Sequence, residues 1–254
     1  MRRRGLAVGV TAMVLSIGLP GCGPVRETAE DITEVAVEST VEAPDAALAG
    51  NAVVAQAARS VVKIHTVAES CQKTLDGSGV VIAPNKVMSA AHAVAGADTV
   101  SVWVGDTERP ARVVVFDPKM DISVLDVPDL RVPPLPLDQQ TAMTGADALV
   151  LGYPGGGPFV ATPARVRKVI ELLVPDIYHT TTVNREVYVI RGPIRHGGSG
   201  GPLIDLNGRV LGISFGAAVD DPDTGFVVTA REVFKLLAAG VGAPAPVAPG
   251  VCVP

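Results

Sequence analysis

Aromatic residues and cysteines are scarce in this chain of 254 residues, which has five Phe, three Tyr, one Trp and three Cys. It contains neither a His-Glu-x-x-His motif nor a paired Cys-x-x-Cys motif, so nothing predicts a zinc site, and we expect no metal or cofactor. An excess of basic residues is also missing, because the formal net charge is −5. A general nucleic-acid binder needs a basic surface to displace counterions from phosphates. Nucleic acid is therefore not an expected partner.

The N-terminal apolar run, residues 5–19, is shorter than the ~20 residues that a membrane-spanning helix needs. It follows three arginines at 2–4, which is typical of an export signal. The run ends in Leu-Pro-Gly-Cys at 19–22, which resembles the bacterial lipobox. We therefore expect residues 1–21 to be a lipoprotein-type signal peptide and Cys22 to be lipidated. Pro20 departs from the usual small residue, and this leaves an ordinary cleaved signal and an uncleaved anchor as alternatives.

Residues 22–50 contain no aromatic residue, and their acids are spread among Val, Ala and Thr. Such a segment buries too little apolar surface to offset the entropy lost on ordering, so we expect an acidic flexible tether. The whole chain is 48% hydrophobic with 27 Gly and 21 Pro, which predicts a folded domain with many turns, at residues 51–254.

Short β-rich runs separated by Gly, Pro and Asp fill this domain, and a proline-rich joint at 128–136 divides them into two sets of six. The close spacing of turn signals is typical of antiparallel barrels rather than of alternating strand–helix units. The first set is 61–67, 79–83, 86–90, 99–104, 111–116 and 122–127. The second set is 148–152, 161–169, 187–191, 202–205, 210–215 and 226–229.

We therefore predict an all-β fold of two six-stranded antiparallel β-barrels, barrel 1 at about 60–130 and barrel 2 at about 145–230. Two helices are expected, at Ala52–Arg59 and at Ala230–Ala239, where apolar residues recur at helical spacing. A ligand is expected to bind in the cleft between the two halves.

One serine is surrounded by glycines, in the segment His-Gly-Gly-Ser-Gly-Gly-Pro at 196–202. Glycine reaches backbone conformations that a Cβ would forbid, and it leaves the hydroxyl of Ser199 unobstructed. The N–H groups of such a turn can converge on a developing oxyanion. This pattern predicts a nucleophile, and a flexible turn without chemistry is the alternative.

A nucleophilic serine needs a base, and the base needs a carboxylate that holds its tautomer. His92 is the favoured base because it follows a strand that runs into a turn of small residues. Asp121 is the favoured acid because it opens an apolar strand 29 residues later. The other histidines lie in a strand, a polar loop and the turn of the serine itself: His65, His179 and His196. The rival acids are Asp98, Asp106, Asp117 and Asp126.

The order His92, Asp121, Ser199, with Ala-Ala-His at 90–92, Asp-Ile-Ser-Val-Leu at 121–125 and Gly-Ser-Gly-Gly-Pro at 198–202, resembles the chymotrypsin-fold serine proteases. Within them it is similar to bacterial trypsin-like and HtrA-type members. The segments 151–157 and 225–229 and the two later cysteines further resemble the periplasmic acid-resistance proteases of mycobacteria. The resemblance covers roughly residues 52–254. It implies chymotrypsin-like barrels with the active site between them.

The resemblance also implies a role for each residue. Ser199 would attack the scissile carbonyl, His92 would take and return the proton, and Asp121 would orient His92. The N–H groups of Gly197 and Ser199 would form the oxyanion hole. Many relatives carry Asp before the serine, where it pairs with a newly cut N-terminus on activation. Gly198 stands there in this chain, so no such switch is expected.

The substrate pocket is predicted by position. Pro193 stands six residues before the serine, where the family has the base of the primary pocket. Pro193 is not acidic, so we do not expect cleavage after Lys or Arg. An apolar wall that favours a small or medium apolar side chain would be formed by Ile194, Ser214, Phe215 and Gly216.

Two cysteines remain if Cys22 carries lipid. Cys71 and Cys252 are then an even number in an oxidising extracytoplasmic space, and we expect them to form a disulfide. Two unrelated buried thiols are the alternative.

The sequence thus predicts an exported serine endopeptidase that hydrolyses cell-envelope proteins or peptides through an acyl-enzyme. A lipid on Cys22 would tether it to the outer face of the cytoplasmic membrane. The alternative function is a catalytically silent, protease-like binding or chaperone module of the envelope.

Overall fold

The computed structural model describes residues 41–242 and 245–253. The predicted signal peptide at 1–21, the lipidation site Cys22 and the tether up to residue 40 lie outside the described residues. None of the described helices is long and apolar enough to cross a lipid bilayer.

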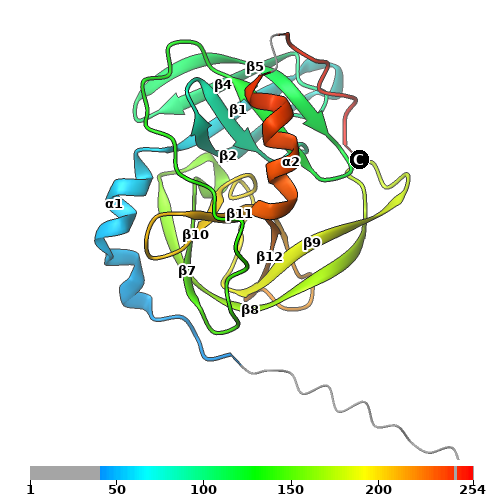
Figure 1. Ribbon diagram of the computed structural model, residues 1–254. Coiled ribbons are helices and arrows are strands. Elements are labelled where there is room, and N and C mark those ends of the chain that lie inside the picture. The colour runs from blue at the N-terminus through cyan, green and yellow to red at the C-terminus, as the bar shows by residue number, and fades with distance from the viewer. Residues whose placement is uncertain (1–40, 243–244, 254) are drawn as a thin grey trace, which may run out of the picture. The chain divides into compact units, whose positions relative to one another are not determined.

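The twelve strands of the described residues form two closed antiparallel barrels, which confirms the predicted all-β architecture (Figure 1). The first barrel has the strand order β1-β2-β3-β6-β5-β4 and the second the order β10-β11-β12-β9-β8-β7. The first comprises β1 (Val61–Ala68), β2 (Lys73–Ala83), β3 (Lys86–Ser89), β4 (Thr99–Val104), β5 (Thr107–Asp117) and β6 (Ile122–Asp126). The second comprises β7 (Asp147–Gly152), β8 (Val160–Pro175), β9 (Thr182–Arg191), β10 (Pro202–Ile204), β11 (Val210–Ala217) and β12 (Thr224–Thr229).

Neighbouring residues in several strands face two different cores, because successive side chains of a strand point to opposite faces. In β2, Val81 packs inside the first barrel while Val80 joins an apolar cluster shared by both barrels. In β7, Val150 packs inside the second barrel while Leu149 joins the shared cluster. The barrels are therefore joined by a continuous apolar core, which fixes the position of residues contributed by each of them.

Two helices add to this shared core. Helix α1 (Ala52–Ala58) begins at Asn51, whose side chain accepts a hydrogen bond from the N–H of Val53. Helix α2 (Ala230–Val241) contacts β5 and β6 of the first barrel and β11 and β12 of the second (Figure 1). Its buried Val233 belongs to the shared cluster. Both helices lie within two residues of their predicted bounds, 52–59 and 230–239.

The proline-rich joint is fixed to both barrels by hydrogen bonds. The N–H of Leu135 donates to the carbonyl of Val81 at 2.9 Å in the first barrel. The N–H of Val210 in the second barrel donates to the carbonyl of Pro136 at 2.8 Å. The joint therefore ties the two barrels together along its length.

The β8–β9 hairpin extends well beyond the residues that the sequence predicted as strand. It is paired out to Pro175 and Thr182, whereas the predicted runs were 161–169 and 187–191. Its tip reaches the first barrel, where the N–H of Ile177 donates to the carbonyl of Pro118 at 3.2 Å. The added length places the hairpin tip beside the loop that precedes β6.

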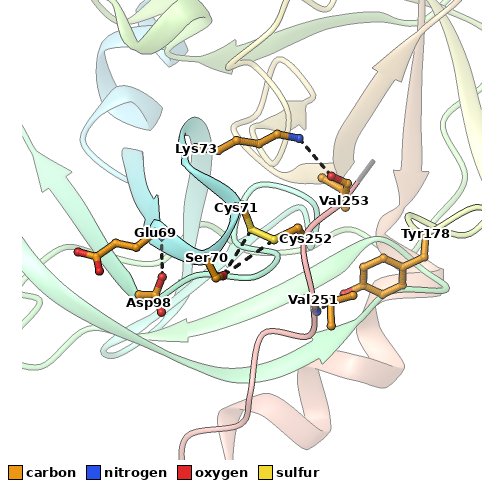
Figure 2. Close-up of a disulfide and its surroundings, with 9 residues drawn as sticks. All are labelled: Glu69, Ser70, Cys71, Lys73, Asp98, Tyr178, Val251, Cys252 and Val253. Atoms are coloured by element: carbon orange, nitrogen blue, oxygen red, sulfur yellow. Dashed lines mark hydrogen bonds between the residues drawn. A yellow bond between two sulfur atoms is a disulfide. The ribbon is translucent and has the colours of Figure 1, made fainter.

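The C-terminal segment crosses back to the first barrel and is held there by a disulfide between Cys71 and Cys252 (Figure 2). This confirms the predicted pairing. Beside the disulfide, the Nζ of Lys73 donates to the carbonyl of Val253 at 3.2 Å, and the N–H of Val251 donates to the hydroxyl of Tyr178 at 3.2 Å. Tyr178 lies at the tip of the β8–β9 hairpin, so the tail contacts both barrels.

Candidate active site

Asp121 and His92 form a hydrogen-bonded pair at the base of β6. The Oδ2 of Asp121 lies 2.7 Å from the Nδ1 of His92, and its Oδ1 accepts the backbone N–H of His92 at 2.9 Å. The backbone N–H of Ala91 donates to the Asp121 carbonyl at 3.1 Å. Asp121 is 3% exposed and adopts a left-handed backbone, with φ of 57°, which aims the carboxylate back at the histidine. Both carboxylate oxygens are therefore committed to a single residue.

Three of the four rival acids have other partners. Asp98 accepts the N–H of Glu69, Asp117 accepts the N–H groups of the turn that follows it, and Asp126 pairs with Lys86. The remaining rival, Asp106, is exposed in the turn between β4 and β5. Asp121 is thus the acid that the structure brings to His92.

The other histidines lie elsewhere. His65 is on β1 and its Nδ1 lies 3.0 Å from the Oδ1 of Asp76 in an exposed pair. His179 is at the tip of the β8–β9 hairpin, and the side chain of His196 is exposed in the serine turn. Only His92 combines a buried carboxylate with a position next to the serine turn.

The environment of His92 raises its pKa above the ordinary value of 6.5. Desolvation opposes protonation, but the charge of Asp121 and its hydrogen bond to Nδ1 favour the protonated ring more strongly. The cationic Arg185 nearby acts against protonation. With Asp121 ionised, the Nδ1 of neutral His92 carries the proton and Nε2 is left as the acceptor.

The carbonyl groups of the turn that carries Ser199 all accept hydrogen bonds, most of them from neighbouring segments. Gly155 N–H donates to the His196 carbonyl at 2.7 Å, and the Ser78 hydroxyl donates to the Gly197 carbonyl at 2.7 Å. The Ser214 hydroxyl donates to the Gly198 carbonyl at 2.9 Å, and the Ser78 N–H donates to the Ser199 carbonyl at 2.9 Å. The carbonyls of His196, Gly197 and Ser199 are therefore directed out of the turn, while the Gly198 carbonyl also accepts the N–H of Gly201 within the turn at 3.1 Å.

This arrangement leaves two N–H donors available. Since the N–H and C=O of a trans peptide point in opposite directions, fixing the His196 carbonyl aims the Gly197 N–H the other way. Within the described part of the chain, the N–H groups of Gly197 and Ser199 donate no hydrogen bond. Gly197 has φ of 80°, and a Cβ there would come 2.5 Å from the nitrogen of Gly155. Such a pair of unused N–H donors is what an oxyanion hole requires, and the close approach to Gly155 requires glycine at 197.

The serine turn packs against the segment that leads to His92. A Cβ on Gly200 would come 2.7 Å from the nitrogen of Ala90, and one on Gly77 would contact both Ala93 and the Ser199 carbonyl. No hydrogen bond between the Ser199 hydroxyl and His92 is present among the described residues. Such contacts are commonly loose in proteins without bound substrate. Ser199 and His92 come from different barrels, and contacts between their neighbouring residues hold the two segments together.

A cavity of about 300 Å³ opens beside the His92–Asp121 pair. Its other walls are Phe215 on β11, Val253 of the C-terminal tail and the tip of the β8–β9 hairpin, with the contributions Val174, Pro175, Asp176, Ile177 and His179. The hairpin and tail residues were missed in the sequence because they lie far from the motifs and carry no pattern of their own.

Arg185 on β9 lies in the wall of this cavity and is 3% exposed. Its Nε donates to the carbonyl of Lys119 at 2.7 Å, and its guanidinium lies 5.2 Å from the centre of the Phe215 ring. Burial lowers the pKa of Arg185 from its ordinary value, while neighbouring carboxylates raise it. Arg185 thus joins the hairpin to the loop before Asp121 and places a positive charge near His92.

The predicted substrate-pocket residues separate into three places. Pro193 and Ile194 line a small cavity of about 10 Å³ that also contacts Gly198. Ile194 fills the space next to β12, because a Cβ on Gly225 would come 2.7 Å from its Cδ1. Ser214 is fully buried under the serine turn. Phe215 lines the cavity beside His92, and Gly216 follows it on β11.

No group of three or more His, Cys, Asp or Glu side chains in the described residues is arranged to hold a metal ion. The chemistry available at this site is that of the hydroxyl, imidazole and carboxylate groups, with backbone N–H donors.

Comparison with known proteins agrees with this geometry. Residues 77–213 match the model of the trypsin-like peptidase domain. The chain belongs to the trypsin-like peptidases. Serine protease Rv3671c of Mycobacterium tuberculosis is 55% identical over 214 residues, which cover 84% of this chain and 54% of that protein. The chain thus spans about half the length of this curated relative. A probable periplasmic DegP-like serine endoprotease of Halomonas elongata is 33% identical over 54% of this chain and 28% of its own length.

Solved structures separate two states of the M. tuberculosis peptidase. The active form of Rv3671c protease has a TM-score of 0.82 at 54% identity, covering 84% of this chain and 94% of that one. The inactive form has a TM-score of 0.71 at 52% identity, covering 78% and 98%. The described fold of this trypsin-like peptidase therefore has the higher TM-score against the active form.

Proposed function

We propose that this trypsin-like peptidase is an exported serine endopeptidase that cleaves proteins of the cell envelope through an acyl-enzyme. The observation that carries the proposal is the serine turn, in which the carbonyls of His196, Gly197 and Ser199 are held outward beside the pair of His92 and the buried Asp121. A silent binding module would have no need of this arrangement. The alternative, a protease-like binding or chaperone module, becomes one outcome of the test below.

The proposed mechanism follows from the positions of these groups. The Ser199 hydroxyl attacks the scissile carbonyl while the Nε2 of His92 accepts its proton. The N–H groups of Gly197 and Ser199 bind the developing oxyanion. Asp121, with Oδ2 at 2.7 Å from Nδ1, stabilises the imidazolium. His92 then gives the proton to the leaving amine, and water hydrolyses the acyl-enzyme by the same route.

The substrate preference that we propose is a small or medium apolar side chain before the cleaved bond. Ile194 closes the space next to Gly225, and no acid lines the small cavity that Pro193 and Ile194 share. A long basic side chain would therefore find neither room nor a countercharge there.

The proposed location is extracytoplasmic, with an anchor on Cys22. The export-type N-terminus and the disulfide support it, since disulfides persist in oxidising compartments. The similarity to the probable periplasmic endoprotease of H. elongata also supports it. The substrates would then be proteins or peptides of the envelope.

The proposal is tested by labelling the purified full-length protein with a fluorophosphonate and locating the adduct by mass spectrometry. We expect the adduct on Ser199, and expect it to be lost in Ser199→Ala and reduced by at least about 10³-fold in rate in His92→Ala. His65→Ala is the matched control, because it removes a histidine from the other Asp–His pair, and it should label normally. A folded protein that is not labelled would favour the binding module.

The activity should depend on pH with a midpoint above 6.5. The base is competent only when His92 is neutral, and its pKa is raised above that value. Below the midpoint, kcat/KM should fall about tenfold per pH unit. Initial rates on a peptide p-nitroanilide between pH 4.5 and 9 measure this. A profile that stays flat down to pH 5 would contradict both the raised pKa and the role of His92.

A further inference from the structure

Ser78 on β2 is a serine of the first barrel with every hydrogen-bonding group in use. It is fully buried, with glycine on both sides at 77 and 79. Its hydroxyl donates to the Gly197 carbonyl at 2.7 Å and accepts the N–H of Tyr153 at 2.8 Å. Its backbone N–H donates to the Ser199 carbonyl at 2.9 Å, and its own carbonyl accepts the hydroxyl of Ser89 at 2.7 Å.

The two peptide planes that Ser78 fixes lie on either side of an oxyanion-hole donor. The Gly197 carbonyl belongs to the plane before, and the Ser199 carbonyl to the plane after, the peptide that carries the Ser199 N–H. The intervening peptide joins these planes at the Cα atoms of Gly198 and Ser199, so fixing both planes fixes both of its ends. Rotation of the peptide between these ends is opposed by the hydrogen bonds of its own carbonyl, that of Gly198. Ser78 therefore sets the position of the peptide that carries the Ser199 N–H, although it touches neither donor.

The site accepts serine and little else. A Cβ on Gly152 would come 2.6 Å from the Ser78 hydroxyl, so β7 packs directly against this side chain and leaves no room for a larger one. Alanine would fit, but it would leave the Gly197 carbonyl and the Tyr153 N–H without the partner they share.

We propose that Ser78 is a positioning residue for the peptidase reaction, which holds the oxyanion hole of the second barrel open from the first barrel. The inference rests on the proposed function. Ser78, a residue at the contact between the barrels, would then stabilise the transition state of the reaction in addition to the fold. The hydroxyl acts through the Gly197 carbonyl, while the backbone N–H of Ser78 holds the Ser199 carbonyl, and neither group takes part in binding the ground-state substrate.

The test compares Ser78→Ala with Ser60→Ala in the full-length protein. Ser60 is the matched control, because its buried hydroxyl also donates a 2.7 Å hydrogen bond to a carbonyl, that of Pro133. Rates on a peptide p-nitroanilide and the affinity for the boronic acid of the same peptide are measured, together with the melting temperatures. The boronate forms a tetrahedral adduct with Ser199 and so reports on the oxyanion hole.

We expect Ser78→Ala to lower kcat about 10- to 100-fold and to weaken boronate binding by a similar factor, with KM nearly unchanged. Ser60→Ala should keep the wild-type kcat even if it melts earlier. Ser78→Cys retains a weak donor of similar shape and should fall between the two. It also carries the test if Ser78→Ala does not fold.

Two results would overturn the proposal. One is a Ser78 variant that keeps wild-type kcat and boronate affinity. The other is an equal loss of kcat in Ser60→Ala, which would mean that the effect is one of stability alone. If the wild-type protein neither cleaves the peptide nor reacts with a fluorophosphonate, that result would contradict the proposed function, and this inference would fail with it.

Discussion

Replacing Asp121 with Asn is expected to lower kcat by about 10⁴-fold while the protein stays folded. The reason is that the two carboxylate oxygens of Asp121 contact different groups of His92. Oδ1 accepts the backbone N–H of His92, so the amide oxygen of Asn must take that place and the amide NH₂ must face Nδ1. Nδ1 would then be an acceptor, and the proton of the neutral ring would lie on Nε2, where it cannot receive the proton of Ser199.

The fold should survive this change because Asn tolerates the left-handed backbone of position 121 and has nearly the same shape. Steady-state kinetics and thermal melts of the variant measure both effects. Asp76→Asn makes the same substitution in the exposed pair with His65, and it should leave kcat within about twofold. An Asp121→Asn enzyme with near wild-type kcat would show that another acid orients the base.

Reduction of the disulfide between Cys71 and Cys252 is expected to cost about 2–5 kcal/mol of stability. The bridge joins residues 181 positions apart, so it restricts nearly all of the folded domain in the unfolded state. For a domain of this size the melting temperature should fall by roughly 5–15 °C. The loss should also reach the active site, since the freed tail includes Val253, which lines the cavity beside His92.

Differential scanning calorimetry with and without reductant measures the change, with thiol titration to establish the redox state. The double variant Cys71→Ser, Cys252→Ser should melt like the reduced wild type and should not respond to reductant. An unchanged melt, with both thiols free before reduction, would reject the bridge.

Prediction from the sequence succeeded where a short sequence pattern is enough to indicate the structure. The paired barrels followed from twelve short runs with turn signals between them, and the structure has strands at all twelve. The disulfide followed from counting cysteines in a chain that was expected to be exported. The pair formed by His92 and Asp121 followed from a family order, and the structure places them in hydrogen-bond contact.

Prediction from the sequence failed where tertiary contacts determine the structure. The outer part of the β8–β9 hairpin contains the run Ile-Glu-Leu-Leu-Val at 170–174, which has no alternation typical of a half-buried strand. It is a strand because it pairs with β9 and its tip contacts Pro118. Arg185 was missed for the same reason, because only the folded hairpin carries it to the active site.

Ser78 left a faint signal that could have been used. Glycine inside a strand marks a place where another backbone approaches closely, and Ser78 has glycine on each side. The partner that approaches, the turn at 197–199, could not be named without the fold.

Protonation of His92 beside Asp121 also couples catalysis to the folding equilibrium. Because the folded pKa of His92 lies above its unfolded value of 6.5, the native state binds this proton more tightly than the unfolded chain does. The resulting stabilisation is fully present below pH 6.5 and is lost as the pH rises through the folded pKa. At this pair, protonation in mild acid lowers turnover and stabilises the fold, so activity and this contribution to stability change in opposite directions with pH.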